Sequence, residues 1–314
     1  MTVDIMLPFY GDPSLLRIAV RSVQSQDDPD WRLTVVDDGY PDDGVRRWFE
    51  ELRDERIDYR RNAKKLGANG NYRRCLDLIE HDVAVLMGAD DIMLPHYVST
   101  IKQVHRAHPE AGIIQVGVEL IDENGKPYRT VVDQAKQRLY APRVEKSRLM
   151  GGEELATSLL RGNWLYFPAL AWRSDALRDK GFRDGLKVVQ DLALVIDLLL
   201  AGETMVVESK VCFQYRRHRG SDSSLRALTG TRFIEERRYF LRISRELEAR
   251  GWHCAARVAR NHVSSRLHAL TVLPQAIRHG HRSGIQNLIR HAFMPARADR
   301  GTRRERPAIP PDAG

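Results

Sequence analysis

The stretch Val83-Ala84-Val85-Leu86-Met87-Gly88-Ala89-Asp90-Asp91 is the most informative in this chain. Its apolar half is typical of a buried strand, and two adjacent carboxylates follow it. Because like charges repel, an ionised pair needs a cation or a polar ligand nearby. Hard divalent cations such as Mg²⁺ are often held by one or two carboxylates plus substrate phosphates. The stretch predicts a metal–phosphate site, although a solvated turn that opens a helix around Pro95 explains the pair equally well.

A second carboxylate pair, Asp37-Asp38, follows another short β-rich run at residues 33–36. An earlier strand over 3–7 stops at Pro8, and apolar residues at helical spacing over 14–26 separate the two runs. Strands that alternate with helices predict a mainly parallel sheet with right-handed crossovers. Such sheets bind ligands at the carboxyl ends of their strands. This edge would gather Phe9-Tyr10, Asp37-Asp38 and Asp90-Asp91 into a nucleotide site.

Four segments, in their order and spacing, resemble the family 2 glycosyltransferases of the GT-A fold. They are IMLPFYGD (5–12), VVDDG (35–39), LGANGNYRRCL (66–76) and LMGADD (86–91). The resemblance covers roughly residues 1–225 and implies an α/β fold of GT-A type, a mainly parallel twisted sheet flanked by helices. The charge and periodicity of the later residues add a C-terminal basic helical appendage. The expected domains are a catalytic domain over 1–225, with a nucleotide-sugar half at about 1–120 and an acceptor half at about 121–225, a basic helical region over 226–296 and a disordered tail over 297–314.

The resemblance also implies roles for individual residues. Asp38 would contact the nucleotide base, Asp90 the ribose and Asp91 a divalent metal, Mn²⁺ or Mg²⁺. The chain has Gly88 where many relatives have the first Asp of a DXD motif, so metal binding would rest chiefly on Asp91. Further residues expected to bind the nucleotide sugar are Pro8, Tyr10, Asp12, Asn71 and Arg73.

The chemistry of these side chains suits those roles. A sugar nucleotide leaves as a diphosphate, and a divalent cation stabilises the negative charge that grows on it. The N–H of uracil or thymine suits an acceptor-only group such as ionised Asp38, which favours a UDP- or dTDP-sugar. Asn71 and Arg73 follow a glycine-rich turn, and helix N-termini favour phosphate. A plain N-cap explains Asn71 equally well.

The segment VVQDLAL (188–194) stands where the family has a Glu-Asp pair that opens a helix. The resemblance implies that Asp191 is the catalytic general base, with Gln190 in place of the first acid. One carboxylate near the anomeric carbon suffices for inversion, because it can accept the proton of the attacking hydroxyl. Without the upstream motifs, Asp191 would be interpreted as a helix cap.

Two further segments fit the resemblance. In YRRHRGS (215–221), His218 would reach the metal or the diphosphate and Arg216 would neutralise phosphate charge, although a basic surface turn is the alternative. The segment 162–173 resembles the loop and strand that shape an acceptor pocket, where Trp164 and Arg173 are expected. Buried core packing explains Trp164 equally well.

Composition favours a soluble enzyme. The chain has 314 residues, 42% of them hydrophobic, and no run approaches the ~20 apolar residues of a membrane span. No apolar N-terminal segment indicates a secretory signal. Its 3 cysteines are far apart, which favours reduced thiols and a cytoplasmic setting.

Charge is uneven along the chain. From Arg226 onward there are 18 arginines and no lysine against 7 acidic residues, so residues 1–225 carry a small net negative charge. Basic amphipathic helices can lie on an anionic membrane surface, which would bring an enzyme with a polysaccharide or lipid-linked glycan acceptor to the inner face of the membrane. Alternatively, these helices pack on the sheet and expose a basic side.

Two rival functions stay open. Gly88 and Gln190 are the grounds for a degenerate family member that binds nucleotide sugar without transferring it. A pI of about 9.5 permits a basic nucleic-acid-binding α/β protein. However, the positive charge lies outside the region of the motifs and no nucleic-acid module is recognisable, so no nucleic-acid partner is expected.

Overall fold

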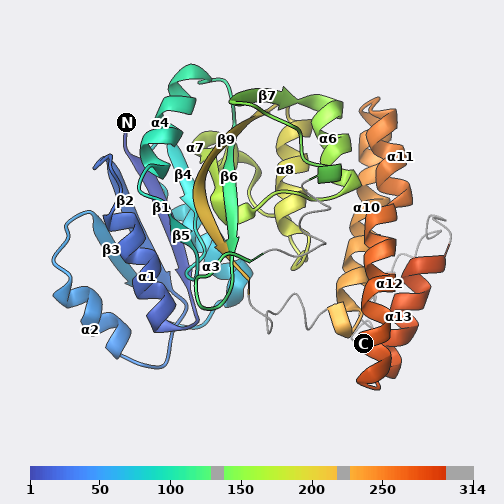
Figure 1. Ribbon diagram of the computed structural model, residues 1–314, viewed down its shortest axis with the longest axis horizontal. Helices are drawn as coiled ribbons and strands as arrows, with labels where there is room; N and C mark the ends of the chain where they lie inside the picture. The colour runs from blue at the N-terminus through green and yellow to red at the C-terminus, as the bar shows by residue number, and fades with distance from the viewer. Residues whose placement is uncertain (129–137, 218–226, 295–314) are drawn as a thin grey trace, which may run out of the picture.

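The computed structural model describes residues 1–128, 138–217 and 227–294 and shows a mixed α/β fold around one sheet (Figure 1). The strand order is β3-β2-β1-β4-β8-β6-β9-β5, and β7 pairs with β9. The strands are β1 (Val3–Phe9), β2 (Trp31–Asp37), β3 (Ile57–Arg61), β4 (Val83–Leu86), β5 (Ile92–Met93), β6 (Ile113–Ile121), β7 (Ser147–Gly151), β8 (Leu170–Arg173) and β9 (Thr204–Arg216). The helices are α1 (Pro13–Gln24), α2 (Gly44–Glu51), α3 (Gly67–Asp77), α4 (Tyr97–Ala107), α6 (Gly152–Arg161), α7 (Ser174–Lys180), α8 (Gln190–Leu200), α10 (Thr231–Ala249), α11 (His253–Asn261), α12 (Val263–Arg278) and α13 (Arg282–Phe293), with a 3₁₀ turn η1 (Phe167–Ala169).

The strands β3, β2, β1 and β4 are parallel, and α1, α2 and α3 connect them. Strands β1, β2 and β4 are buried almost without a break, as expected of parallel strands covered on both faces. Neighbouring residues set the start of α1. Asp12 is its N-cap, because Asp12 Oδ1 accepts a hydrogen bond from the Ser14 N–H at 2.7 Å, and Pro13 occupies the first turn. The expected parallel sheet is confirmed for this half of the fold.

The other half of the sheet is mixed. Strand β8 is antiparallel to both β4 and β6, β5 and β7 are antiparallel to β9, and only β6 and β9 pair in parallel. The β6–β9 register slips at Gly117, where a Cβ would lie 2.7 Å from the Ser209 carbonyl oxygen. Glycine is therefore needed for this close approach. Strand direction beyond β4 was not predicted, because it is not encoded in the apolar pattern of a strand.

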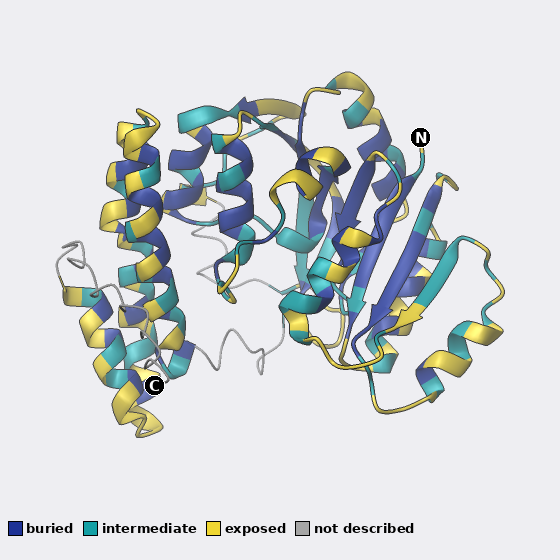
Figure 2. Ribbon diagram, turned by 180° about the vertical axis from the view of Figure 1, so that it is seen from behind, coloured by how far each residue is buried: buried dark blue, intermediate teal, exposed yellow. Residues whose placement is uncertain are grey.

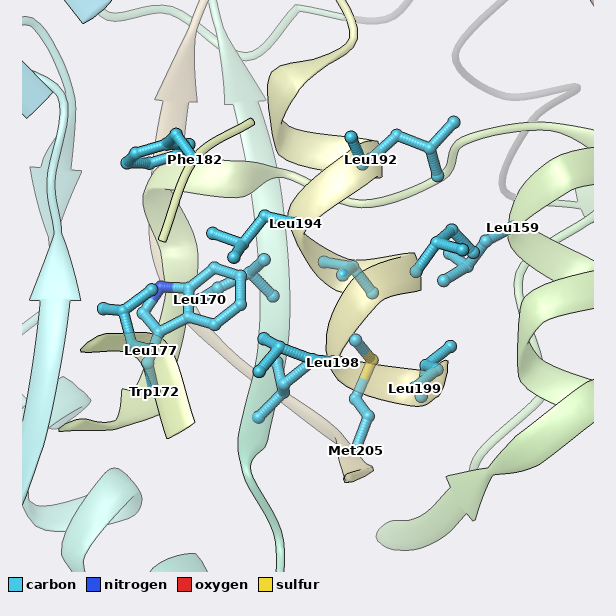
Figure 3. Packing of buried hydrophobic residues seen from close by; sticks show 14 of the residues in the cluster. Leu159, Leu170, Trp172, Leu177, Phe182, Leu192, Leu194, Leu198, Leu199 and Met205 are labelled. Atoms are coloured by element: carbon cyan, nitrogen blue, oxygen red, sulfur yellow. The ribbon is translucent and has the colours of Figure 1, made fainter. Parts of the chain in front are cut away.

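Helix α8 lies at the centre of the larger hydrophobic core (Figure 3). Its apolar residues surround the helix, and Leu194 and Leu198 are 0% and 1% exposed. A helix that is apolar all round must be covered on every side. Trp172 and Leu177 pack on one side of α8 and Leu159 of α6 packs on the other. This packing fixes the position of the helix that carries Asp191.

Helices α10 and α11 complete this core. Tyr239, Phe240 and Ile243 of α10 belong to the same cluster as α8. Helices α12 and α13 instead enclose a separate small cluster that includes Phe233 and Leu288. The boundary expected at residue 225 thus does not separate two cores, because α10 and α11 pack on α8 while α12 and α13 lie beside α10 (Figure 1).

Within the described ranges, no helix combines the length and hydropathy that crossing a membrane requires.

Candidate functional site

Three loops converge where the parallel strands end. In the ladder, Phe9 at the end of β1 pairs with Asp37 at the end of β2, and Met6 pairs with Leu86 at the end of β4. Tyr10, Asp38 and the Asp90-Asp91 pair follow these three strands and therefore share one edge of the sheet. The convergence predicted from the order of strands is confirmed.

Asp91 is the most unusual group at this edge. Its side chain is 1% exposed, Oδ1 accepts the Arg216 N–H at 2.9 Å, and Oδ2 has no hydrogen-bond partner. Burial, and then the charge of Asp90, raises the pKa of Asp91 well above its ordinary value, while Arg216 acts in the opposite direction. Keeping this carboxylate ionised therefore calls for further positive charge, and a divalent cation at Oδ2 would supply it.

The residues present fit a metal ion held by one side chain. The described part of the chain holds no cluster of three or more His, Cys, Asp or Glu that could bind a metal by itself. The unpartnered oxygen of Asp91 supplies one ligand, and substrate phosphates and water would supply the rest, as is common for Mg²⁺. His218, the second expected ligand, lies outside the described residues.

Gly88 makes room for the Asp91 carboxylate. A Cβ at this position would overlap Asp91 Oδ2 and lie 3.0 Å from Asp90 Oδ1. The glycine that departs from the DXD pattern is therefore a packing requirement of this turn. Its absence of a side chain allows Asp91 to occupy the space in front of residue 88.

Arg216 joins three segments at the same edge. Its backbone N–H holds Asp91, its Nε donates to the Asp90 carbonyl at 2.7 Å, and its Nη1 donates to the Asp122 and Glu123 carbonyls at 3.0 and 3.2 Å. The residue is 4% exposed. In place of the expected phosphate contact, the structure gives Arg216 a positioning role at the Asp90-Asp91 turn.

Asp38 and Asn71 connect β2 to α3. The Asp38 carboxylate accepts the N–H groups of Leu66 and Gly67 at 2.7 and 2.8 Å, and also the Asn62 amide at 3.1 Å. Asn71 donates from Nδ2 to the Val36 carbonyl at 2.8 Å. Because α3 begins at Gly67, the expectation that Asn71 begins the helix is wrong. Its amide is buried in the second turn.

Two tyrosines lie beside each other at this edge of the sheet. Tyr10 is 49% exposed, its ring lies 5.9 Å from that of Tyr40, and Lys65 Nζ lies 3.4 Å from its centroid. Pro8 lies within β1, beyond the last residue that pairs with β4. Tyr40 and Lys65 were not predicted. Tyr40 directly follows the Asp-Asp-Gly turn, and this position could have indicated it. Its N–H donates to Asp37 Oδ1 at 2.7 Å, which fixes the residue beside the carboxylate pair.

Tyr215 directly precedes Arg216, whose backbone N–H binds Asp91. Burial is the main reason that the pKa of Tyr215 rises to about 12, and the charges of Asp91, Asp90 and Asp191 add to this rise. The Arg217 guanidinium acts on this pKa in the opposite direction. Asp191 is the second residue of α8, and its Oδ1 accepts the Leu192 N–H at 2.8 Å. Asp191 therefore lies at the N-terminal end of α8.

Helix α10 holds the start of α8. Glu235 Oε1 accepts three consecutive backbone N–H groups, those of Lys187, Val188 and Val189, at 2.9, 2.6 and 3.1 Å. Arg73 of α3 approaches the same connection, because it pairs with Asp184 at 2.6 Å. Sequence reasoning missed Glu235, since no local pattern relates it to a turn almost fifty residues away.

Two acceptor-site predictions need correction. Trp164 is 4% exposed and belongs to the main core, and its Nε1 donates to Ser158 Oγ at 3.1 Å. Arg173 pairs with Val83, the first residue of β4, and so lies at the opposite edge of the sheet from Asp91. There it forms ion pairs with Asp175 and Glu203, both at 2.7 Å.

The chain resembles known glycosyltransferases in sequence. Residues 4–159 match the family model for glycosyl transferase family 2. Over 104 residues, 32% of this chain and 33% of the relative, the sequence is 32% identical to the GalNAc(5)-diNAcBac-PP-undecaprenol beta-1,3-glucosyltransferase of Campylobacter jejuni.

Solved structures share its fold. S. aureus TarS in complex with UDP-GlcNAc superposes with a TM-score of 0.58 at 13% identity, over 93% of this chain and 90% of that one. The mannosyltransferase PcManGT of Pyrobaculum calidifontis, in complex with GDP-Man and Mn²⁺, gives 0.58 at 14% identity over 92% and 85%. The matched sequence and the shared architecture lead to one conclusion: the chain belongs to the family 2 glycosyltransferases and has the GT-A fold.

Proposed function

We propose that this glycosyltransferase moves a sugar from a nucleotide-diphosphate sugar to an acceptor hydroxyl with inversion at the anomeric carbon. The observation that carries the proposal is the buried Asp91 carboxylate, whose Oδ2 has no partner at the edge where β1, β2 and β4 end. A buried anion with an open coordination position suits a metal-bound diphosphate. A purely structural aspartate would have both oxygens satisfied.

In this proposal, the chain's residues divide the donor between them. Asp38 and the exposed ring of Tyr10 receive the base, Asp90 receives the ribose, and Asp91 would hold Mn²⁺ or Mg²⁺. When bound, the ion would supply Lewis-acid stabilisation of the diphosphate leaving group. Asp38 is 2% exposed and already accepts three hydrogen bonds, and in this proposal its fourth acceptor position takes a base N–H. This favours a UDP- or dTDP-sugar.

Asp191 acts as the general base. The acceptor oxygen attacks the anomeric carbon, its proton passes to the Asp191 carboxylate, and the bond between the anomeric carbon and the diphosphate oxygen breaks with both electrons going to the oxygen. A single displacement of this kind inverts the anomeric centre. The position of Asp191 in the first turn of α8, whose start Glu235 holds through three backbone N–H groups, supports a fixed base.

The acceptor class follows from similarity and charge. The Campylobacter jejuni relative bears a name that describes an undecaprenol-diphosphate-linked glycan as its acceptor. Together with the basic C-terminal region, this supports a glycan or lipid-linked acceptor at the inner face of the membrane for this chain. A water-soluble polysaccharide acceptor would need no such surface.

A nucleotide panel tests the donor. Thermal unfolding is followed with UDP, dTDP, GDP, CDP and ADP, each with and without Mn²⁺. A ligand at 100 times its dissociation constant stabilises the native state by about 2.7 kcal/mol. We expect one uracil or thymine nucleotide to raise the unfolding temperature more than the others do, and only when Mn²⁺ is present. Asp91→Asn should remove this dependence on Mn²⁺. Metal dependence that persists in Asp91→Asn would contradict the assignment of Asp91.

Turnover tests the base. We expect Asp191→Asn to keep the nucleotide response while sugar transfer falls by ~10²-fold or more. Asp175→Asn, at the opposite edge of the sheet, is the matched control and should transfer at the wild-type rate. Equal turnover in the Asp191→Asn enzyme would remove Asp191 from the mechanism. A nucleotide response without transfer in the wild-type enzyme would favour the degenerate sugar-nucleotide binder, for which the buried, unpartnered Gln190 Oε1 is the structural ground.

A further inference from the structure

Helix α12 exposes an apolar stripe to solvent. Val263, Leu267 and Ile277 are 58%, 55% and 57% exposed, and Leu270 and Pro274, also exposed, continue the same line. The spacings along this line alternate between four and three residues, so the five side chains follow one face of the helix. On the opposite face, Ala269 and Ala276 are fully buried, and the partly buried Val272 and Leu273 pack against the same small cluster. The exposed stripe takes no part in this packing.

Helix α13 also exposes apolar side chains to solvent. Ile289 and Phe293, four residues apart, are 44% and 68% exposed. Soluble proteins scatter single apolar residues over their surface, but a continuous stripe on one helix with more on its neighbour marks an interaction surface. We call the exposed side chains at 263, 267, 270, 274, 277, 289 and 293 the α12–α13 surface. Figure 2 shows how much of this helix pair is exposed.

The charge around this surface has one sign. Residues 263–294 contain no Asp or Glu, and their arginines are Arg266, Arg278, Arg282 and Arg290. Arg266 donates to backbone carbonyls such as those of Ala292 and Met294. Arg278 and Arg282 are exposed on either side of the turn between the two helices. Apolar side chains flanked by arginines, with no acidic residue, match the pattern of helices that lie in the headgroup layer of anionic lipids.

We propose that the α12–α13 surface docks on an anionic phospholipid membrane. A second copy of the chain fits this surface less well, because a symmetric contact would bring arginines together without acidic partners. The stripe is also only about two heptads long and contains Pro274, whereas coiled coils need a longer apolar repeat. Phospholipid headgroups supply the negative charge that the protein surface lacks.

The position of the surface gives docking a purpose. In Figure 1, α12 and α13 extend along the lower half of the molecule, the half toward which β1 and β4 run. Docking would bring Asp38 and Asp91, at the edge where β1, β2 and β4 end, near the lipid surface. A lipid-linked acceptor presents its sugar there. Only this purpose rests on the proposed function, because the surface itself is independent of the transfer reaction.

Flotation of the full chain with vesicles tests the proposal. The probes are phosphatidylcholine vesicles alone and vesicles with roughly one third phosphatidylglycerol. We expect binding to the anionic vesicles that is at least ~10-fold stronger than to the neutral ones and weakens as salt is raised. Leu267→Gln combined with Ile277→Gln should weaken anionic binding by ~10-fold or more.

Exposed apolar residues elsewhere supply the control. Ile18 and Val211 are 42% and 45% exposed, so Ile18→Gln combined with Val211→Gln removes similar side chains away from the α12–α13 surface. This control should bind vesicles as the wild type does. The absence of vesicle binding would overturn the proposal, as would equal weakening in both double variants. A dimer in sedimentation that Leu267→Gln and Ile277→Gln dissociate, without vesicle binding, would assign the surface to a second copy.

The nucleotide panel, run without vesicles, separates the two proposals. An intact nucleotide response without lipid binding would reject membrane docking alone. Lipid binding without any nucleotide response would reject the proposed donor site alone.

Discussion

Gly88 lies beneath the Asp91 carboxylate, where a Cβ would overlap Oδ2 and come within 3.0 Å of Asp90 Oδ1. We expect Gly88→Ala to displace the Asp91 side chain and to weaken its hydrogen bond with the Arg216 N–H. Overpacking of this kind lowers the free energy of unfolding by about 1–3 kcal/mol. The Mn²⁺-dependent part of nucleotide stabilisation should disappear with the displaced carboxylate, and thermal unfolding with and without Mn²⁺ measures both effects.

Gly11→Ala is the matched control, because a Cβ at Gly11 would meet nothing within 4 Å. This variant lies at the same edge of the sheet and should keep both stability and the Mn²⁺ response. A Gly88→Ala protein with an unchanged Mn²⁺ response would show that the position of Asp91 does not depend on Gly88.

Residue roles were only partly predictable from the sequence. The convergence of Asp38, Asp90 and Asp91 followed from the order of parallel strands, which alternation with helices reveals. The location of Arg173 did not follow, because β8 runs antiparallel to β4 and carries Arg173 to the opposite edge. The partners of Arg216 could not be predicted either, since they are backbone carbonyls from three separate segments.

At the scale of elements, α10 supports the start of α8 through Glu235. Truncation of Glu235 to alanine leaves three N–H groups of the 187–189 turn without their acceptor. We expect Glu235→Ala to lower the free energy of unfolding by about 1–3 kcal/mol. Turnover should fall several-fold while nucleotide binding stays unchanged, because the turn leads into the helix that carries Asp191. Hydrogen exchange at residues 187–189 should accelerate in parallel.

Two variants control this prediction. Glu235→Gln keeps an acceptor oxygen and should retain most of the turnover. Glu248→Ala removes another carboxylate of α10, one that pairs with His253 and Arg260 at the surface, and should have little effect. Slower exchange at 187–189 in Glu235→Ala would contradict the proposed support.

The alternation of elements was predictable, but some boundaries were not. The helix for which Asn71 was a candidate N-cap in fact begins at Gly67, whose φ of 77° is in the left-handed region. The N–H groups of Leu66 and Gly67 bind the Asp38 carboxylate, which directly follows β2 and lies far in the sequence from the residues before the helix. Rules based on local capping residues cannot detect a capping group that arrives from another strand.

The whole molecule should lose stability in mild acid. His262 and His291 are 0% and 2% exposed, with ring centroids 5.3 Å apart between α10, α12 and α13. Burial is the main cause that lowers the pKa of each to about 4, followed by Arg266 for His262 and by His262 for His291. The other charged groups that face them are Glu236 and Arg237.

The sign of the effect follows from proton uptake. Unfolded imidazoles protonate near pH 6.5, so between pH 6.5 and 4 the unfolded chain binds protons that the native chain does not. Stability should be complete above pH 6.5 and fall as the pH approaches 4, by up to about 3 kcal/mol for each histidine. Urea unfolding at about pH 7.5 and about pH 5 measures the difference.

Substitution of histidines tests the source of this loss. His291→Gln should reduce the dependence on pH, whereas His279→Gln, at an exposed position, should leave it as in the wild type. An unfolding midpoint that does not change with pH would contradict a neutral His262–His291 pair.

The packing of α10 and α11 on α8 limits how modular this enzyme can be. The family model ends at residue 159, yet the core closes only with Tyr239, Phe240 and Ala256 from much later in the chain. A chimera that took its C-terminal region from a distant relative would need matching side chains at each of these positions to close the core. Diversification by exchange of whole segments is therefore easiest after Asn261, where α11 ends and the main core has already been closed.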